Sequence, residues 1–151
     1  MRYLWWVPII FLAFLLQGSI SILAVSPNLT ALVVYFIGIR YGRTQGLVSG
    51  VLIGALEDSL SSGMLGPNML AKGLVGFLSA SFISGNFLIW TPLSGTVAAA
   101  LLTLADNAVV FLSLTLFDKV PAHPSAALFT TTMQSLMNAP AGFFMRPKNV
   151  D

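Results

Sequence analysis

Residues 46–84 read GLVSGVLIGALEDSLSSGMLGPNMLAKGLVGFLSASFIS, and this stretch decides the fold. Small residues recur at every fourth position in each half of the stretch, and each series includes one charged residue. The two series are Gly46, Gly50, Gly54 and Asp58, and Lys72, Gly76, Ala80 and Ser84. Because residues four apart lie on one face of a helix, each half predicts a helix with a stripe of small side chains.

The segment between the two stripes, residues 61–67, favours a reversal of the chain, since it reads SSGMLGP. We therefore expect an antiparallel hairpin of two membrane helices whose stripes contact each other. Asp58 and Lys72 would lie at the same end of this hairpin and form an ion pair, with the amide groups of the turn as a second set of partners for Asp58. The alternative is that the stripes contact a partner protein, because small residues also line contacts between membrane helices.

The composition identifies lipid as the solvent for much of the chain. Of the 151 residues, 56% are hydrophobic and 8% are charged, whereas a soluble domain is about 25% charged. A spanning helix needs roughly 20 mostly apolar residues, so the length allows about five or six spans. We expect an all-α integral membrane protein with about six transmembrane helices, forming one polytopic domain over residues 1–151.

Breaks at proline, glycine and polar residues divide the chain into the expected spans. They cover residues 1–25, 29–39, 44–60, 68–84, 93–117 and 125–145. The first could instead be a signal peptide, but its apolar run exceeds the usual length of roughly 7–15 residues, and Pro27 would hinder cleavage. The second is short, so it either tilts into the interface through Tyr35 and Tyr41 or is shielded by its neighbours.

The basic residues predict the orientation, because Lys and Arg near span ends are enriched on the cytoplasmic side. With six spans, Lys119 falls on one side of the membrane, and Lys72 lies just inside that same side. The other side collects Arg2, Arg40, Arg43, Arg146 and Lys148. Both termini are therefore expected in the cytoplasm, and the turn at residues 61–67 is expected outside.

Two sets of polar residues fall within the expected spans. Asp58 is near the C-terminal end of its helix, where the helix dipole disfavours an anion. We expect it to clamp the hairpin through Lys72, and the alternative is a proton or ion site.

Asp106 and Asn107 lie about midway along the fifth span, where a charge is costly. We expect them to make polar contacts between helices, and the alternative is a proton relay or a substrate contact. Their expected partners are Asn138, Gln134 and Gln17.

No pattern in the sequence points to catalysis, a cofactor or a metal. The chain has no Cys, which excludes disulfides and thiol chemistry. Its single His, His123, lacks partners at ligand spacing, and there is no nucleophile–base pair or phosphate-binding loop. A net charge of +2 is too small for a nucleic-acid-binding surface. We therefore expect a protein that is neither an enzyme nor a cofactor binder.

Several of these motifs together resemble the rod shape-determining protein MreD family. The resemblance rests on Pro27-Asn28, the segment Arg40–Arg43, the glycine-rich run that ends at Asp58, and the turn with Ser62-Gly63 and Leu65-Gly66. The run from Asn138-Ala139-Pro140 to Arg146 is also similar. The positions that match the family pattern are Pro27, Asn28, Gly54, Asp58, Gly63 and Gly66. Glu57 departs from this pattern, which leaves open which of the two neighbouring carboxylates has the motif's role.

The resemblance implies a non-enzymatic scaffold of the bacterial cytoplasmic (inner) membrane that helps to position peptidoglycan synthesis during cell elongation. Its implied partners are an MreC-type bitopic protein, RodA, a class B penicillin-binding transpeptidase and the actin-like MreB filament. Structural or partner-interface roles are expected for Pro27, Asn28, Gly46, Gly50, Gly54, Asp58, Gly63, Gly66, Asn68, Lys72, Gly76 and Ala80. An intramembrane polar site is expected at Asp106, Asn107 and Asn138.

The family is also similar to the substrate-binding S-components of energy-coupling-factor transporters, which implies an S-component-like bundle and supplies an alternative function. As such a subunit, the chain would hold a small molecule in a polar pocket near the outer side, lined by Glu57, Asp58 and Asn68. The first span lacks the A-x-x-x-A pattern expected at the contact with the transport motor. This absence favours the scaffold.

Overall fold

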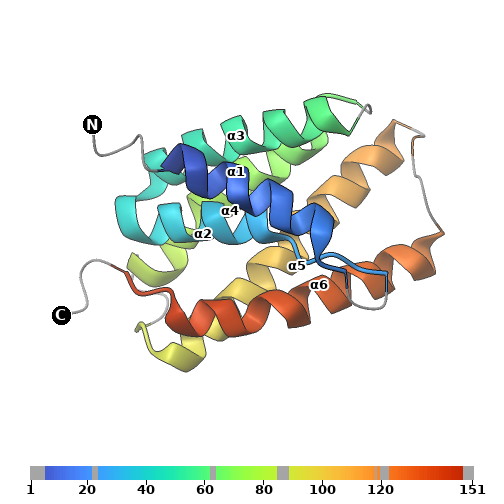
Figure 1. Ribbon diagram of the computed structural model, residues 1–151. Coiled ribbons are helices and arrows are strands. Elements are labelled where there is room, and N and C mark those ends of the chain that lie inside the picture. The colour runs from blue at the N-terminus through green and yellow to red at the C-terminus, as the bar shows by residue number, and fades with distance from the viewer. Residues whose placement is uncertain are drawn as a thin grey trace.

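The computed structural model describes residues 6–21, 24–61, 64–84, 89–117, 119 and 123–147. Within this part the chain forms helices that run back and forth in one bundle (Figure 1). They are α1 (Trp6–Ser19), α2 (Leu29–Tyr41), α3 (Arg43–Leu60), α4 (Pro67–Ser84), α5 (Pro92–Leu116) and α6 (Pro124–Phe144). The all-helical fold is confirmed, and the bounds of α3 to α6 fall within a residue of the expected spans.

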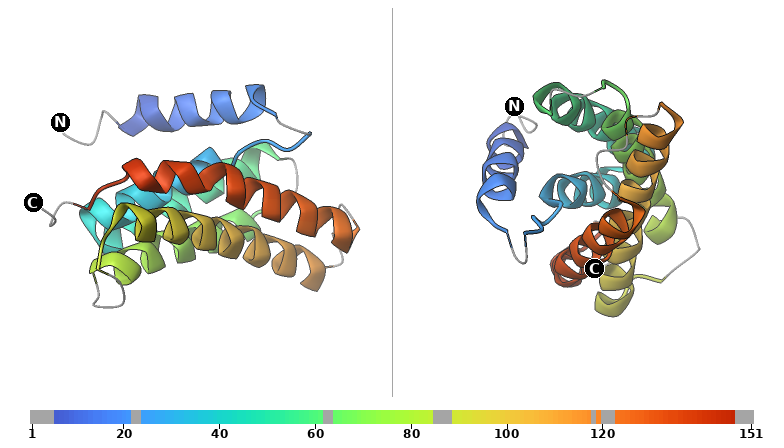
Figure 2. Two further views of the ribbon diagram at one scale, coloured as in Figure 1. Left: turned by 90° about the horizontal axis from the view of Figure 1, so that it is seen from below. Right: turned by 90° about the vertical axis from the view of Figure 1, so that its right-hand side faces the viewer.

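The first helix is shorter than expected, since the predicted span reached residue 25 and α1 ends at Ser19. Ala24, between α1 and α2, takes a left-handed φ of 63°. Asn28 then caps α2, because its Oδ1 accepts the N–H of Ala31 at 3.1 Å. α1 lies beside α2 at the edge of the bundle (Figure 2).

α3 and α4 form the antiparallel hairpin that the glycine stripes predict, with their backbones in direct contact. A Cβ atom added at Gly46 would overlap the carbonyl of Gly76, and one added at Gly50 would overlap the carbonyl of Lys72. Gly54 has the same relation to Asn68. Larger side chains at these glycines would force the two helices apart. The stripe of α3 is therefore covered by α4 within the chain.

Two further glycine contacts were not predicted. Gly38 of α2 fits against the Gly76 carbonyl and the Ser79 side chain of α4, with no room for a Cβ atom. Gly95 of α5 and Gly142 of α6 face each other, and a Cβ atom on either would overlap the carbonyl of the other. Close backbone contact therefore also joins α2 to α4 and α5 to α6.

α2 is the central helix of the bundle and contacts all five others. Its 13 residues make it about 20 Å long, which is shorter than the roughly 30 Å hydrocarbon core of a bilayer. Val34 and Tyr35 are buried, and the Tyr35 hydroxyl donates to the Gly95 carbonyl at 3.4 Å. Of the two arrangements open to this short segment, the structure therefore has the one in which neighbours shield it.

Apolar side chains cover much of the outside of the bundle, while Lys72, Asp106 and Asn138 lie inside. Leu60 and Phe144 are 70% and 82% exposed, whereas Lys72 and Asp106 are each 1% exposed. Soluble proteins have the reverse distribution, so this arrangement fits a surface that faces lipid. Among the described helices, α5 is the one whose length and apolar composition suffice by themselves to cross a membrane.

We predict that Gly50→Ala destabilises the protein and that Gly18→Ala does not. The Cβ atom at residue 50 would overlap backbone atoms of Lys72, and overpacking of this kind costs about 1–3 kcal/mol. Position 18 has no other atom within 4 Å of an added Cβ, so alanine there should be neutral or slightly stabilising. The measurement is the unfolding temperature of each purified variant in one detergent. Equal values for Gly50→Ala and the wild type would contradict the close α3–α4 contact.

Candidate functional site

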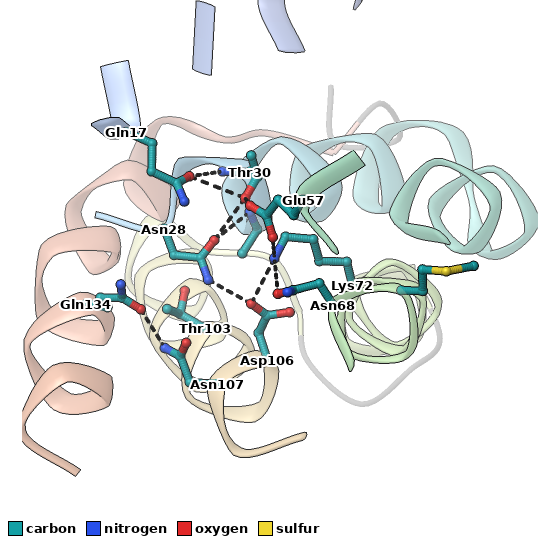
Figure 3. A network of polar contacts seen from close by, with 12 residues as sticks. Gln17, Asn28, Thr30, Glu57, Asn68, Lys72, Thr103, Asp106, Asn107 and Gln134 are labelled. Carbon is teal, nitrogen blue, oxygen red and sulfur yellow. Dashed lines mark hydrogen bonds and ion pairs between the residues drawn. The ribbon is translucent and has the colours of Figure 1, made fainter. Parts of the chain in front are cut away.

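Polar side chains from five helices meet where α3 ends and α4 begins (Figure 3). We call this set the polar cluster. It consists of Asn28, Thr30, Glu57, Asn68, Lys72, Thr103, Asp106 and Asn138. Asn28 precedes α2, and the other members lie on α2 to α6. The cluster therefore joins every helix of the bundle except α1, which reaches it through the Gln17 carboxamide, an acceptor for Thr30.

Lys72 is the centre of the polar cluster. Its Nζ lies 2.5 Å from Glu57 Oε2 and 3.4 Å from Asp106 Oδ2, and it also donates to Asn68 Oδ1 at 3.5 Å. The Thr30 hydroxyl donates to the other oxygen of Glu57. A buried ammonium is tolerated only when it is paired and fully hydrogen-bonded. These three oxygen partners meet that requirement for Lys72.

The predicted pair between Asp58 and Lys72 is wrong, because Asp58 binds the start of α4 instead. Its carboxylate accepts the backbone N–H groups of Gly66, Asn68 and Met69 at 2.8, 3.1 and 3.2 Å, and the Asn68 side-chain amide at 2.8 Å. The first turn of a helix offers unpaired N–H groups and the positive end of the helix dipole. These donors offset the unfavourable position of Asp58 on α3, and Glu57 takes its place beside Lys72. The second expected partner set, the amides of the turn, is confirmed at Gly66.

Asp106 is buried as expected, but its partners differ from those predicted. Its Oδ2 accepts from Asn28 Nδ2 at 2.7 Å and from Lys72 at 3.4 Å, and no hydrogen bond joins it to Gln17, Gln134 or Asn138. Successive residues on a helix point about 100° apart. For this reason Asp106 faces α2 and α4, whereas Asn107 faces α6 and donates to Gln134 Oε1 at 2.8 Å.

Asn138 lies at the end of the cluster next to α6 and is fully buried. Its amide donates to the backbone carbonyl of Asn28 at 2.9 Å and to the Thr103 hydroxyl at 3.0 Å. Two buried oxygens of the described residues have no hydrogen-bond partner, and these are Asp106 Oδ1 and Asn138 Oδ1. Both belong to side chains that bind Asn28, so the acceptors in this part of the cluster outnumber the donors.

A cavity of about 490 Å³ opens beside the polar cluster. Its volume is in the usual range for small-molecule sites, about 300–1,000 Å³. Nine of its lining residues have polar or charged side chains: Gln17, Ser26, Asn28, Glu57, Ser61, Asn68, Lys72, Asn107 and Gln134. Glu57 and Asn68 therefore line a cavity as the transporter-subunit alternative expects, but Asp58 does not.

The remaining predicted positions are placed around the cluster. Gly66 has a φ of 133°, which a residue with a side chain rarely adopts. Pro27 and Ala80 are buried, and Gly46, Gly50, Gly54 and Gly76 line the α3–α4 contact. Gly63 lies outside the described residues.

The sequence analysis missed Glu57 as the partner of Lys72 and also missed the contact between α5 and α6. A signal for that contact exists, because Gly95, Ala99 and Thr103 are four residues apart, as are Asn138 and Gly142. This is the same spacing that identified the α3–α4 contact. No comparable signal tells whether Glu57 or Asp58 pairs with Lys72, because the pairing depends on how far each helix is rotated about its axis.

Comparison with known proteins gives one match. A family model described as rod shape-determining protein MreD matches residues 2–139 of the chain. No curated protein and no solved structure matches it.

We predict that Lys72 is coupled more strongly to Glu57 than to Asp58. Lys72→Met would leave Glu57 and Asp106 without their cation, and breaking a buried pair in this way costs about 3–5 kcal/mol. Glu57→Gln should then cost less in the Lys72→Met background than in the wild type, with a coupling energy of about 1 kcal/mol or more. The measurement is a double-mutant cycle on the free energy of unfolding.

The matched control is the cycle of Lys72→Met with Asp58→Asn. Asp58 and Lys72 are connected through Asn68 alone, so their coupling energy should be clearly smaller. A larger coupling to Asp58 than to Glu57 would restore the Asp58–Lys72 clamp and contradict the arrangement described above.

Proposed function

The chain belongs to the MreD family of rod shape-determining proteins, and we propose that it is a non-enzymatic scaffold of the cell-elongation complex. Membership makes it a membrane protein with a role in rod-shape determination. The scaffold role is our inference from the way the bundle is built. In this role the chain holds a partner beside it in the bilayer and so helps to position peptidoglycan synthesis.

The observation that carries this proposal is that the inner polar groups bind one another while the outer surface is apolar. Lys72, Glu57 and Asp106 are held by partners within the chain, and the glycine contacts fix α2, α3 and α4 against one another. The outer faces present exposed apolar side chains such as Leu52, Leu112 and Leu136. A bundle with a fixed interior and an apolar exterior suits a protein that offers a firm surface to another membrane helix.

We further propose that all six helices cross the cytoplasmic membrane and that both termini face the cytoplasm. Three arginines lie at the end of the bundle where α2 and α6 finish, and each guanidinium lies over an aromatic ring. Arg40 is 5.7 Å from the Phe36 ring centre, Arg43 is 5.9 Å from that of Phe77, and Arg146 is 5.3 Å from that of Trp90. Basic residues are enriched at the cytoplasmic interface, whereas Trp and Tyr are enriched at both interfaces, so the three arginines carry the orientation.

The direct partner that we propose is an MreC-type bitopic protein. RodA, a class B penicillin-binding transpeptidase and the MreB filament would belong to the same complex. A bitopic protein has a single membrane helix that must find its position by lateral contact. The long apolar faces of this bundle offer such a contact without exposing a polar group to lipid.

The cavity beside the polar cluster favours a second candidate function, which is a small-molecule-binding subunit of a transporter. Glu57 and Asn68 line the cavity as that function requires. The likeness to S-components stays a prediction, since no solved structure matches the chain. Thermal stabilisation by a vitamin-like ligand would distinguish this candidate from the scaffold.

We predict that depletion of the protein turns rod-shaped host cells into spheres. A copy with Gly18→Ala should restore the rods, whereas Gly50→Leu should not, because leucine would separate α3 from α4 and remove the firm surface. Cell shape is measured by microscopy, and the amount of each variant in the membrane is measured in parallel. Co-purification in mild detergent should recover the MreC-type protein with the wild type. Unchanged cell shape after complete depletion would overturn the scaffold role.

A further inference from the structure

The cavity beside the polar cluster offers free acceptors on its wall and no free cation among the described residues. Lys72 is its only described basic residue, and an ammonium has three protons to donate. Those protons already face Glu57, Asp106 and Asn68. Lys72 therefore has no free donor for a ligand, and an anionic group in the cavity would meet no available cation.

Acceptors, in contrast, remain free on the cavity wall. Glu57 lines the cavity, its side chain is 13% exposed, and its two oxygens have one described partner each. A carboxylate can accept about four hydrogen bonds, so Glu57 has capacity left. Asn107 also lines the cavity, and its side chain takes part in one described hydrogen bond, as a donor to Gln134 (Figure 3). Its carbonyl oxygen is free among the described residues.

The formal charges next to the cavity also favour a cationic ligand. Glu57 and Asp106 are two carboxylates, and Lys72 is the one basic side chain in contact with them. Asp58 is not part of this balance, because its carboxylate is occupied by donors at the start of α4. With both carboxylates ionised, the formal charge of this group of three side chains is one negative, and a positive group bound in the cavity would offset it.

We propose that this cavity binds a cationic amine group, either an ammonium or a guanidinium. Glu57 and the Asn107 carbonyl oxygen are the acceptors on the cavity wall to which such a group would donate. It would leave the Lys72–Glu57 pair in place. The group could belong to a free small amine or to a lysine or arginine side chain of the partner protein. The two sources share this chemistry and are separated by experiment.

The first experiment measures binding to the purified full chain in nanodiscs of zwitterionic lipid, with ethylammonium chloride as the probe. Sodium propionate and propanol are the anionic and neutral controls of similar size. Ethylammonium should raise the unfolding temperature in a dose-dependent manner, and calorimetric titration should give its affinity. A stabilisation by propionate as large as that by ethylammonium would overturn the proposal.

Variants locate the site. Glu57→Gln should weaken the affinity for ethylammonium roughly 10- to 100-fold, because a charge-assisted hydrogen bond is lost. Asn107→Asp adds a carboxylate to the wall and should strengthen it about 5- to 10-fold. This second variant keeps the test decisive if Glu57→Gln fails to fold, because general destabilisation cannot tighten binding. Thr96→Val removes an exposed hydroxyl that binds its own helix and should leave the affinity unchanged. Unchanged affinity in the Glu57 and Asn107 variants would overturn the proposal.

The second experiment identifies the source of the group. In native membranes, a photo-crosslinking residue replaces Leu60, which lines the cavity and is 70% exposed. A crosslink to a basic segment of the MreC-type protein that is lost when its Lys and Arg are changed to Gln would assign the group to the partner. Binding of ethylammonium without that crosslink would assign it to a free amine. If both the crosslink and the binding of ethylammonium are absent, the proposal is overturned. The crosslinking experiment rests on the proposed function, whereas ethylammonium binding to the purified chain does not. A failure of the proposed function can therefore be told apart from a failure of the binding proposal.

Discussion

The ion pair between Lys72 and Glu57 is the contact on which the arrangement of α3, α4 and α2 depends. A lysine buried inside the bundle must meet a carboxylate at close range, because an unpaired buried charge is costly. Gly50 lies against the backbone of Lys72 and is two helical turns before Glu57 on the same helix. The absence of a side chain at residue 50 thus lets α4 approach α3 until Lys72 reaches Glu57 at 2.5 Å. The glycine stripe and the ion pair are two parts of one constraint.

That constraint extends through the polar cluster to the rest of the bundle. Asp106 brings α5 to Lys72, and Asn28 connects Asp106 to the start of α2 and to Asn138 on α6. A side chain in lipid has few competing partners, so a network of this kind favours one arrangement of helices over others, which is a role attested for some buried polar groups. The same network leaves a cavity and spare acceptors at its edge. Packing and any binding capacity of this protein thus come from the same residues.

The sequence allowed most of the fold to be predicted, and the structure shows where prediction stops. The four-residue spacing of glycines located the α3–α4 contact, since periodicity fixes which residues share a face. The spacing also placed Asp58 and Lys72 at one end of the hairpin, but it could not decide that Glu57, one residue away, faces Lys72. That choice depends on helix rotation, which is set by the N–H groups of Gly66 and Met69, at the start of α4, donating to the Asp58 carboxylate. The partners of Asp106, which are Asn28 and Lys72, were missed because both are far away in sequence.

Solid-state NMR on the protein in lipid bilayers tests the central contact most directly. Glu57 is the only glutamate in the chain, and Lys72 is one of its 3 lysines. Labelling the glutamate side-chain carboxyl with carbon-13 and the lysine Nζ with nitrogen-15 therefore isolates this pair in a rotational-echo double-resonance experiment. The account predicts strong dephasing of the glutamate carboxyl signal by the lysine nitrogen, which disappears in Lys72→Met. Absence of dephasing in the wild type would contradict it. In a second sample that carries carbon-13 at the aspartate side-chain carboxyls instead, dephasing of a signal that Asp58→Asn removes would also contradict it.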